Sequence, residues 1–335
     1  MKNSKKIMGF DWLRCILCLS VIALHTNIMS VPNQYVGVDP ANPLIYRIIV
    51  YNLFWAAVPT FMTLSLFLFL IKRNDNSSYF SGKIKSFFII YVFWAILERF
   101  LVTMNGGFIP SELGPWNIFS VISSHENIAY FLFMLLILYV LMELLYRLMK
   151  NKIIKKLFFP LFILTLAAMF LSVKIMNHFS PKPGFLLGNE LGFSNILLFL
   201  PYLFAAFIIY SVYTKKASYK LVLISSIILW VGLAAVDWYI RSNYAMAYNY
   251  ESLGRPSLVF EAIALILLFM KMPESKVPKF VTYASGMTMG LYLIHPIVIN
   301  FVVNNITTIG CLVFTCVVVI TGGFVLITKK VKGIM

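Results

Sequence analysis

The chain has 335 residues, of which 61% are hydrophobic and only 12% are charged, and its mean hydropathy is +0.87. Soluble domains are about half apolar and about a quarter charged, so this composition excludes a soluble fold. The formal net charge of +16 does not indicate nucleic-acid binding, because the basic residues stand in short clusters between apolar runs and form no patch interleaved with aromatic residues.

Ten apolar segments are long enough to cross a bilayer, whose hydrocarbon core takes about 20 helical residues and offers no water to open backbone groups. In chain order they are Phe10–Met29, Ile48–Ile71, Ser86–Met104, Ile128–Leu148, Leu157–Val173, Ile196–Tyr213, Leu221–Ile240, Leu258–Met272, Val281–Val303 and Ile309–Ile327. The sequence therefore predicts an all-α, polytopic integral membrane protein of about ten transmembrane helices. We expect a single transmembrane domain over residues 1–335, with no separate soluble domain.

The loops between these segments predict the orientation, because lysine and arginine are retained on the cytoplasmic side during membrane insertion. One side receives both ends of the chain and the basic loops near residues 72–85, 147–156, 215–220 and 271–279. The other side receives only Arg47, Lys174, Lys182, Arg241 and Arg255. Both termini are therefore predicted to lie in the cytoplasm.

The first segment carries two ionisable side chains at bilayer depth, where each charge costs about 2.5 to 3.5 kcal/mol or more and so marks a functional candidate. Arg14 and His25 are eleven positions apart, which places them on one helix face about 16 Å apart. Arg14 offers a permanent cation for phosphate or carboxylate, and His25 is suited to take a proton from a hydroxyl. The alternatives are that Arg14 snorkels to the interface and that His25 hydrogen-bonds a neighbouring helix.

Three further ionisable residues lie near the cytoplasmic start of the first segment and within the third. Asp11 precedes Arg14 by one turn, where it is placed either to pair with the guanidinium or to serve the helix N-terminus. Glu98 and Arg99 are adjacent and point apart, so each is expected to find a partner on another helix, most simply as a structural ion pair.

Later segments offer supporting groups for His25. Glu261 and Asp237 are candidates to orient or charge-stabilise it, as carboxylates do for catalytic histidines. His295 immediately precedes Pro296 in "GLYLIHP", where the proline frees a carbonyl and bends the helix. The bend either opens a cavity beside His295 or is a packing kink with a satisfied histidine.

The sequence predicts no metal site. Cys15 and Cys18 have the spacing of a redox or metal pair, but no second ligand pair is nearby in the sequence. We expect both cysteines to pack as small apolar residues.

These motifs resemble the membrane acyltransferase family 3, the ten-helix bacterial O-acyltransferases of surface polysaccharides. The resemblance is carried by "FDWLRCILCLSVIALH", by "VPTFMTLSLFLFL", by the basic stretch around Lys83 and Lys85, and by "GMTMGLYLIHP". The sequence departs from the family pattern at two places. Lys83 and Lys85 stand where the family has arginines, and Leu66, which follows Ser65, stands where the family usually has glycine.

The resemblance implies transfer of an acyl group, usually acetyl, from cytoplasmic acyl-CoA to a hydroxyl of a cell-surface glycan or lipid-linked sugar. It implies that His25 is the catalytic base and that Arg14 serves the donor or the acyl path. Lys83 and Lys85 stand where they are expected to meet the phosphates of CoA. No permanently bound cofactor is implied, and the expected location is the bacterial cytoplasmic (inner) membrane.

Two other functions fit the same pattern. A transporter or flippase for a lipid-linked sugar would use buried charges to line a pathway, although the chain shows no internal repeat of the kind found in such proteins. The third possibility is an inactive relative that serves as an assembly partner in a polysaccharide pathway.

Overall fold

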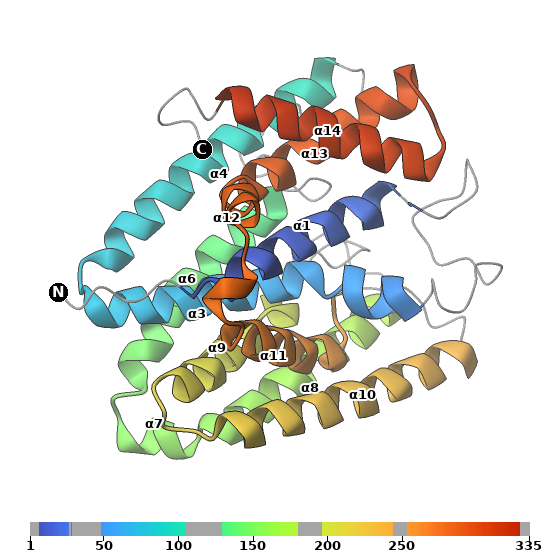
Figure 1. The fold of residues 1–335 in the computed structure, drawn as a ribbon. Helices are drawn as coiled ribbons and strands as arrows, with labels where there is room; N and C mark the ends of the chain where they lie inside the picture. The colour runs from blue at the N-terminus through green and yellow to red at the C-terminus, as the bar shows by residue number, and fades with distance from the viewer. Residues whose placement is uncertain are drawn as a thin grey trace.

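The computed structural model describes residues 7–26, 28, 48–104, 129–179, 196–243 and 253–328. Over these residues the chain is all-helical (Figure 1). The elements are α1 (Gly9–Thr26), the π-helical turn η1 (Val50–Phe54), α3 (Ala57–Asp75), α4 (Tyr79–Met104), α6 (Ala129–Leu148), α7 (Lys152–Lys156), α8 (Phe158–Phe179), η2 (Ile196–Leu198), α9 (Leu200–Tyr213), α10 (Tyr219–Asn243), α11 (Pro256–Met270), η4 (Glu274–Lys276), α12 (Lys279–Ser285), α13 (Thr288–Asn305) and α14 (Gly310–Thr328).

Each of the ten predicted segments coincides with a helix or with a short series of helices. In the described part of the chain, six helices are long and apolar enough to cross a membrane, or seven if the bent pair α12 and α13 forms one span. Two further apolar helices, α11 and the stretch Phe158–Leu171 of α8, are shorter. The chain is therefore a multi-pass membrane protein, while the number ten and the cytoplasmic position of both termini stay predictions.

Two of the differences between the predicted segments and the helices bear on the site. The third segment begins at Tyr79, earlier than the predicted Ser86, because the helix carries Lys83 and Lys85 through its first turns. The ninth is divided into α12 and α13, which are bent by 61° at Gly286 and Met287. An apolar run shows that a segment prefers lipid, but it does not show whether the helix is continuous.

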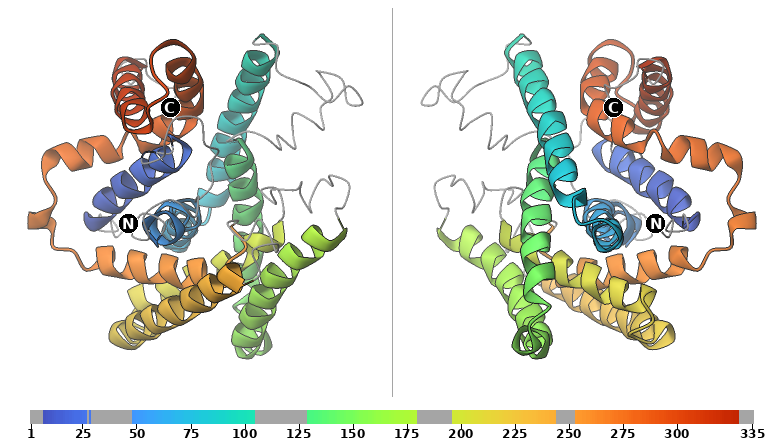
Figure 2. Two further views of the ribbon diagram at one scale, coloured as in Figure 1. Left: turned by 90° about the vertical axis from the view of Figure 1, so that its right-hand side faces the viewer. Right: turned by 90° about the vertical axis from the view of Figure 1, so that its left-hand side faces the viewer.

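The first helix lies inside the bundle. It contacts α3, α11, α12, α13 and α14, and it is placed between the α13–α14 pair and α3 (Figures 1 and 2). Leu13, Leu17, Val21 and Ile22 are fully buried along it. Because neighbours surround α1, its polar residues reach protein groups and not lipid alone.

Other helices form the perimeter. α10 runs along α11 at one edge, whereas α4 packs against α6 at the other (Figure 2). Both expose large apolar side chains, for example Leu221 and Ile228 on α10 and Ile89 and Ile96 on α4. A helix that is apolar all round suits contact with hydrocarbon, so these faces are the expected lipid boundary.

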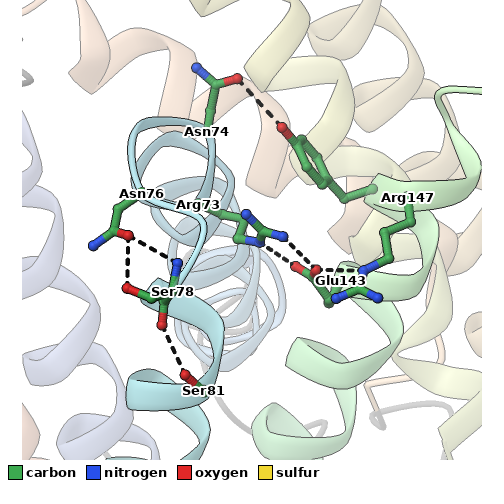
Figure 3. A network of polar contacts seen from close by, with 8 residues as sticks. Arg73, Asn74, Asn76, Ser78, Ser81, Glu143 and Arg147 are labelled. Atoms are coloured by element: carbon green, nitrogen blue, oxygen red, sulfur yellow. Dashed lines mark hydrogen bonds and ion pairs between the residues drawn. The ribbon is translucent and has the colours of Figure 1, made fainter.

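A buried ion-pair network joins the ends of α3 and α6 (Figure 3). Glu143 accepts two hydrogen bonds from Arg73, Nε to Oε2 at 2.7 Å and a terminal nitrogen to Oε1 at 2.9 Å. Arg147 donates to Oε1 of the same carboxylate at 2.8 Å. This bidentate geometry is the stronger form of an arginine–carboxylate pair, and it holds the two helices together beside Lys72.

Candidate active site

The break between α12 and α13 lies beside α1. Non-helical backbone at membrane depth is tolerated where protein surrounds it or where it lines a cavity. Here Ser285, Gly286 and Thr288 line a cavity. The Ser285 hydroxyl donates to Asp11 Oδ1 at 2.8 Å, and the same oxygen lies 3.6 Å from a terminal nitrogen of Arg14. Asp11 therefore connects the break to Arg14, and it does so from the first turn of α1.

The cavity has a volume of about 290 Å³ and extends along one stripe of α3. Phe61, Ser65, Leu68 and Lys72 line it at spacings of three and four residues, so they share a helix face. Eleven residues separate Phe61 from Lys72, which corresponds to about 16 Å along the helix. The lining changes along this length from cationic side chains at Lys72 to aromatic rings at Phe61.

Three cations gather at one end. Arg14, Lys72 and Lys83 all line the cavity, and Lys83 is close enough to the other two for their charges to act on it. Aromatic rings support the lysines: Lys83 Nζ lies 4.1 Å from the ring centroid of Phe87, and Lys72 Nζ lies 5.6 Å from that of Tyr79.

At the cationic end Asp11 pairs with Arg14, whereas among the described residues the two lysines have no such partner. Across the described ranges, no carboxylate lies within ion-pair distance of Lys72 or Lys83. Cation–π contacts leave the positive charges in place. Such an end is suited to a multiply charged anion.

Lys85 is exposed and does not line the cavity. It lies two positions from Lys83, a spacing that places side chains on different helix faces. The structure therefore brings Arg14 and Lys83 together and leaves Lys85 apart from them. Sequence reasoning missed Lys72 as a member of this group, although the stripe of Phe61, Ser65, Leu68 and Lys72 was a readable signal.

Aromatic rings line the other end of the cavity. The Tyr292 ring centroid lies 4.9 Å from that of Phe131 and 6.4 Å from that of Phe61, and all three rings line the cavity. On its other side Tyr292 lies 5.8 Å, centroid to centroid, from His295. Tyr292 thus stands between the cavity and a histidine.

His295 and His25 form a pair. Their ring centroids are 5.3 Å apart and their planes meet at 47°. His295 is fully buried, whereas the His25 side chain is exposed at the far end of α1. A buried and an accessible imidazole therefore lie side by side.

Pro296 explains the orientation of His295. Proline has no N–H, so the carbonyl of Tyr292, four residues earlier, receives no helical hydrogen bond from it. Nδ1 of His295 lies 2.6 Å from that carbonyl oxygen. A carbonyl only accepts, so Nδ1 carries the proton and Nε2 of the neutral ring holds the lone pair. Nε2 is buried and has no hydrogen-bond partner among the described residues.

Arg14 and His25 differ in their relation to this cavity. Arg14 lines the cationic end, while His25 is absent from the lining and is linked to it through His295 and Tyr292. The Tyr292 ring both lines the cavity and contacts His295, so it links the cavity to the histidine pair. This ring is the feature that the helical face of α1 alone did not reveal.

The remaining candidates lie in other surroundings. Glu261 is buried on α11 and interacts with Arg255 and with the Trp230 side chain. Asp237 accepts a hydrogen bond from the Ser257 hydroxyl. These contacts involve α10, α11 and the residue that precedes α11, and the role of Glu261 toward His25 stays a prediction.

Two further predictions concern residues of α1 and α4. The Cys15 thiol contacts the Val281 carbonyl at 3.7 Å and the Cys18 thiol contacts that of Thr288 at 3.6 Å, so both join α1 to α12 and α13. The side chains of Glu98 and Arg99 lie outside the described residues.

Comparison with known proteins bears on this arrangement. A family profile described as an acyltransferase domain matches residues 7–328. Comparisons with curated proteins and with solved structures give no significant match. The matched residues include those that line the cavity, those of the break between α12 and α13, and both histidines. Because it extends over nearly the whole chain, this multi-pass membrane protein belongs to the acyltransferase family 3.

Proposed function

We propose that the protein is a membrane O-acyltransferase that moves an acyl group, most simply acetyl, from acyl-CoA to a hydroxyl of a surface glycan or lipid-linked sugar. The observation that carries the proposal is the pairing of His25 with His295 behind a cation-lined cavity. In this proposal the protein resides in the bacterial cytoplasmic membrane.

The cationic end supports a CoA donor. CoA carries several phosphate charges, and Arg14, Lys72 and Lys83 present positive charge around one cavity. Arginine binds phosphate through a planar fork, while lysine supplies a point charge. The basic loops assign this end to the cytoplasm. With its phosphates there, the donor's pantetheine arm runs along the α3 stripe toward Tyr292.

The histidine pair supports proton removal. His295 has its proton fixed on Nδ1 by the Tyr292 carbonyl, so its Nε2 is a proton acceptor. His25 is exposed and adjacent, which suits it to meet a sugar hydroxyl. In our proposal His25 takes the hydroxyl proton, and His295 orients His25 and shares the positive charge that develops.

The reaction then balances without a further reactant. The hydroxyl oxygen attacks the thioester carbonyl carbon, and its proton passes to His25. The carbon–sulfur bond breaks, and the leaving CoA thiolate takes the proton from the histidine. The products are the sugar ester and free CoA.

Transfer in liposomes tests the proposal. Purified protein is reconstituted with radiolabelled acetyl-CoA outside and a glycan acceptor, and label in the acceptor is counted. We expect labelling by the wild type and by Ser225→Ala, a change on the exposed face of α10, and none by His25→Ala. Size-exclusion profiles of all variants report folding.

The rival functions give different results. Movement of the acceptor across the bilayer without labelling supports a transporter or flippase and contradicts the proposal. A wild type that neither labels nor moves the acceptor, but co-purifies with glycan-assembly proteins, supports an inactive assembly partner.

A further inference from the structure

Three aromatic side chains from different helices meet where the cavity ends. Phe61 of α3, Phe131 of α6 and Tyr292 of α13 line it together, and we call them the aromatic layer. Phe131 and Tyr292 are buried. Because three separate helices supply the rings, the layer is held by the packing of the bundle and not by one flexible segment.

The layer lies at the point that a donor's acyl group must reach. Its Phe61 is about 16 Å along α3 from Lys72 at the cationic end, and its Tyr292 contacts the ring of His295 on the opposite side. A donor anchored by its phosphates therefore presents the far end of its arm to these rings. The thioester stops at the layer, with the histidines immediately behind.

We propose that the aromatic layer limits the acyl group to short chains, so that the donor class is acetyl-CoA and its nearest homologues. This inference rests on the proposed function. Protein interiors are closely packed, and each added methylene requires rings or backbone to shift. An acetyl group needs only a small opening at Tyr292, whereas a longer chain must displace Phe131 or Phe61.

Donors with acyl chains of different length test whether the aromatic layer limits the acyl group. For the reconstituted protein, kcat/KM is measured with acetyl-CoA and with hexanoyl-CoA, and the ratio of hexanoyl to acetyl is compared between variants. We expect Phe131→Ala and Phe61→Ala each to raise this ratio by about tenfold or more, because a single methylene in an apolar pocket is worth about 10-fold or more. The wild type is expected to favour acetyl.

Phe133→Ala is the matched control. Phe133 is buried on the same helix as Phe131 and contacts Tyr91 at 5.5 Å, centroid to centroid, but it does not line the cavity. Phe133→Ala removes the same phenyl ring as Phe131→Ala, so it reports how much any loss of a ring from α6 lowers stability and activity. We expect it to lower thermal stability and to leave the acyl ratio unchanged.

The outcomes separate the two proposals. A wild type that transfers neither acyl group contradicts the proposed function. A wild type that transfers acetyl, with ratios in Phe131→Ala and Phe61→Ala no higher than in Phe133→Ala, contradicts the role of the layer alone. Equal use of hexanoyl-CoA and acetyl-CoA by the wild type also overturns it.

Discussion

The carbonyl oxygen of Tyr292 lies 2.6 Å from Nδ1 of His295, in the position that the missing N–H of Pro296 leaves open. This contact couples a helical hydrogen bond that is missing inside α13 to a histidine tautomer. The proline therefore leaves a free carbonyl that accepts the Nδ1 proton, so that Nε2 of the neutral His295 ring holds the lone pair.

Replacing the proline tests this coupling. Pro296→Ala restores an N–H that competes for the Tyr292 carbonyl, and it removes a residue that costs a helix interior about 3 kcal/mol relative to alanine. We expect higher thermal stability together with acyl transfer reduced by about tenfold or more, because the tautomer of His295 is no longer fixed. Nitrogen-15 NMR of labelled histidine, in nanodiscs, reports the tautomer directly. Unchanged His295 signals and unchanged transfer would show that the carbonyl contact has no influence.

The cationic end gives a second prediction. Lys83→Gln and Lys72→Gln each remove a charge from the cavity, so the KM for acyl-CoA is expected to rise by about tenfold for each while kcat changes little. Such a pattern marks an interaction made equally in the bound and transition states. Steady-state kinetics at two salt concentrations provide the measurement.

Lys85→Gln distinguishes the cavity from the surface of α4. Because Lys85 is exposed outside the cavity, its replacement is expected to change the donor KM less than Lys83→Gln does. Lys152→Gln, on the exposed helix α7, serves as the control for loss of one positive charge. An equal rise in KM for Lys85→Gln and Lys83→Gln would place the phosphate site on the outer surface.

The ion-pair network predicts a change in stability rather than in chemistry. Glu143→Ala leaves Arg73, whose side chain is only 14% exposed, without its carboxylate, and breaking such a partly buried pair costs about 3 kcal/mol. Arg147→Ala removes a side chain that is 64% exposed, so the expected cost is below about 1 kcal/mol. Thermal unfolding in detergent, followed by intrinsic fluorescence, compares the two. Equal losses of stability in the two variants would show that burial of the Arg73–Glu143 pair does not increase its contribution.

Much of the fold was readable from hydropathy, because a helix in lipid must be apolar over its whole length. Arg14 and His25 marked the first helix as a functional candidate, since charged groups at membrane depth need protein partners, and the structure places α1 among α3, α11, α12, α13 and α14. The contact between Arg73 and Glu143 was not readable, because it joins residues 70 positions apart and depends on how α3 and α6 pack. The break at Gly286 was hidden for a similar reason, since its polar lining is supplied by other helices.

The site was predicted in part. The choice of Arg14 and Asp11 came from residue type and spacing, whereas Lys83 came from the resemblance to the family. The structure places these three around or beside one cavity. Helical spacing puts Lys83 and Lys85 on different faces but did not show which of them meets the cavity, nor did it show that Tyr292 contacts both the cavity and His295. Both depend on distances across the bundle, which one helical face does not define.

The most direct test of the histidine pair is acetyl transfer under donor saturation by wild type, His25→Gln and His295→Gln, with CoA binding measured on the same samples. A general base typically contributes about 10²- to 10⁴-fold to a rate, so we expect kcat to fall by about that factor in His25→Gln and to a lesser degree in His295→Gln, with CoA affinity unchanged in both. Variants that bind CoA normally and transfer acetyl at rates close to the wild type would contradict the assignment of proton transfer to this pair.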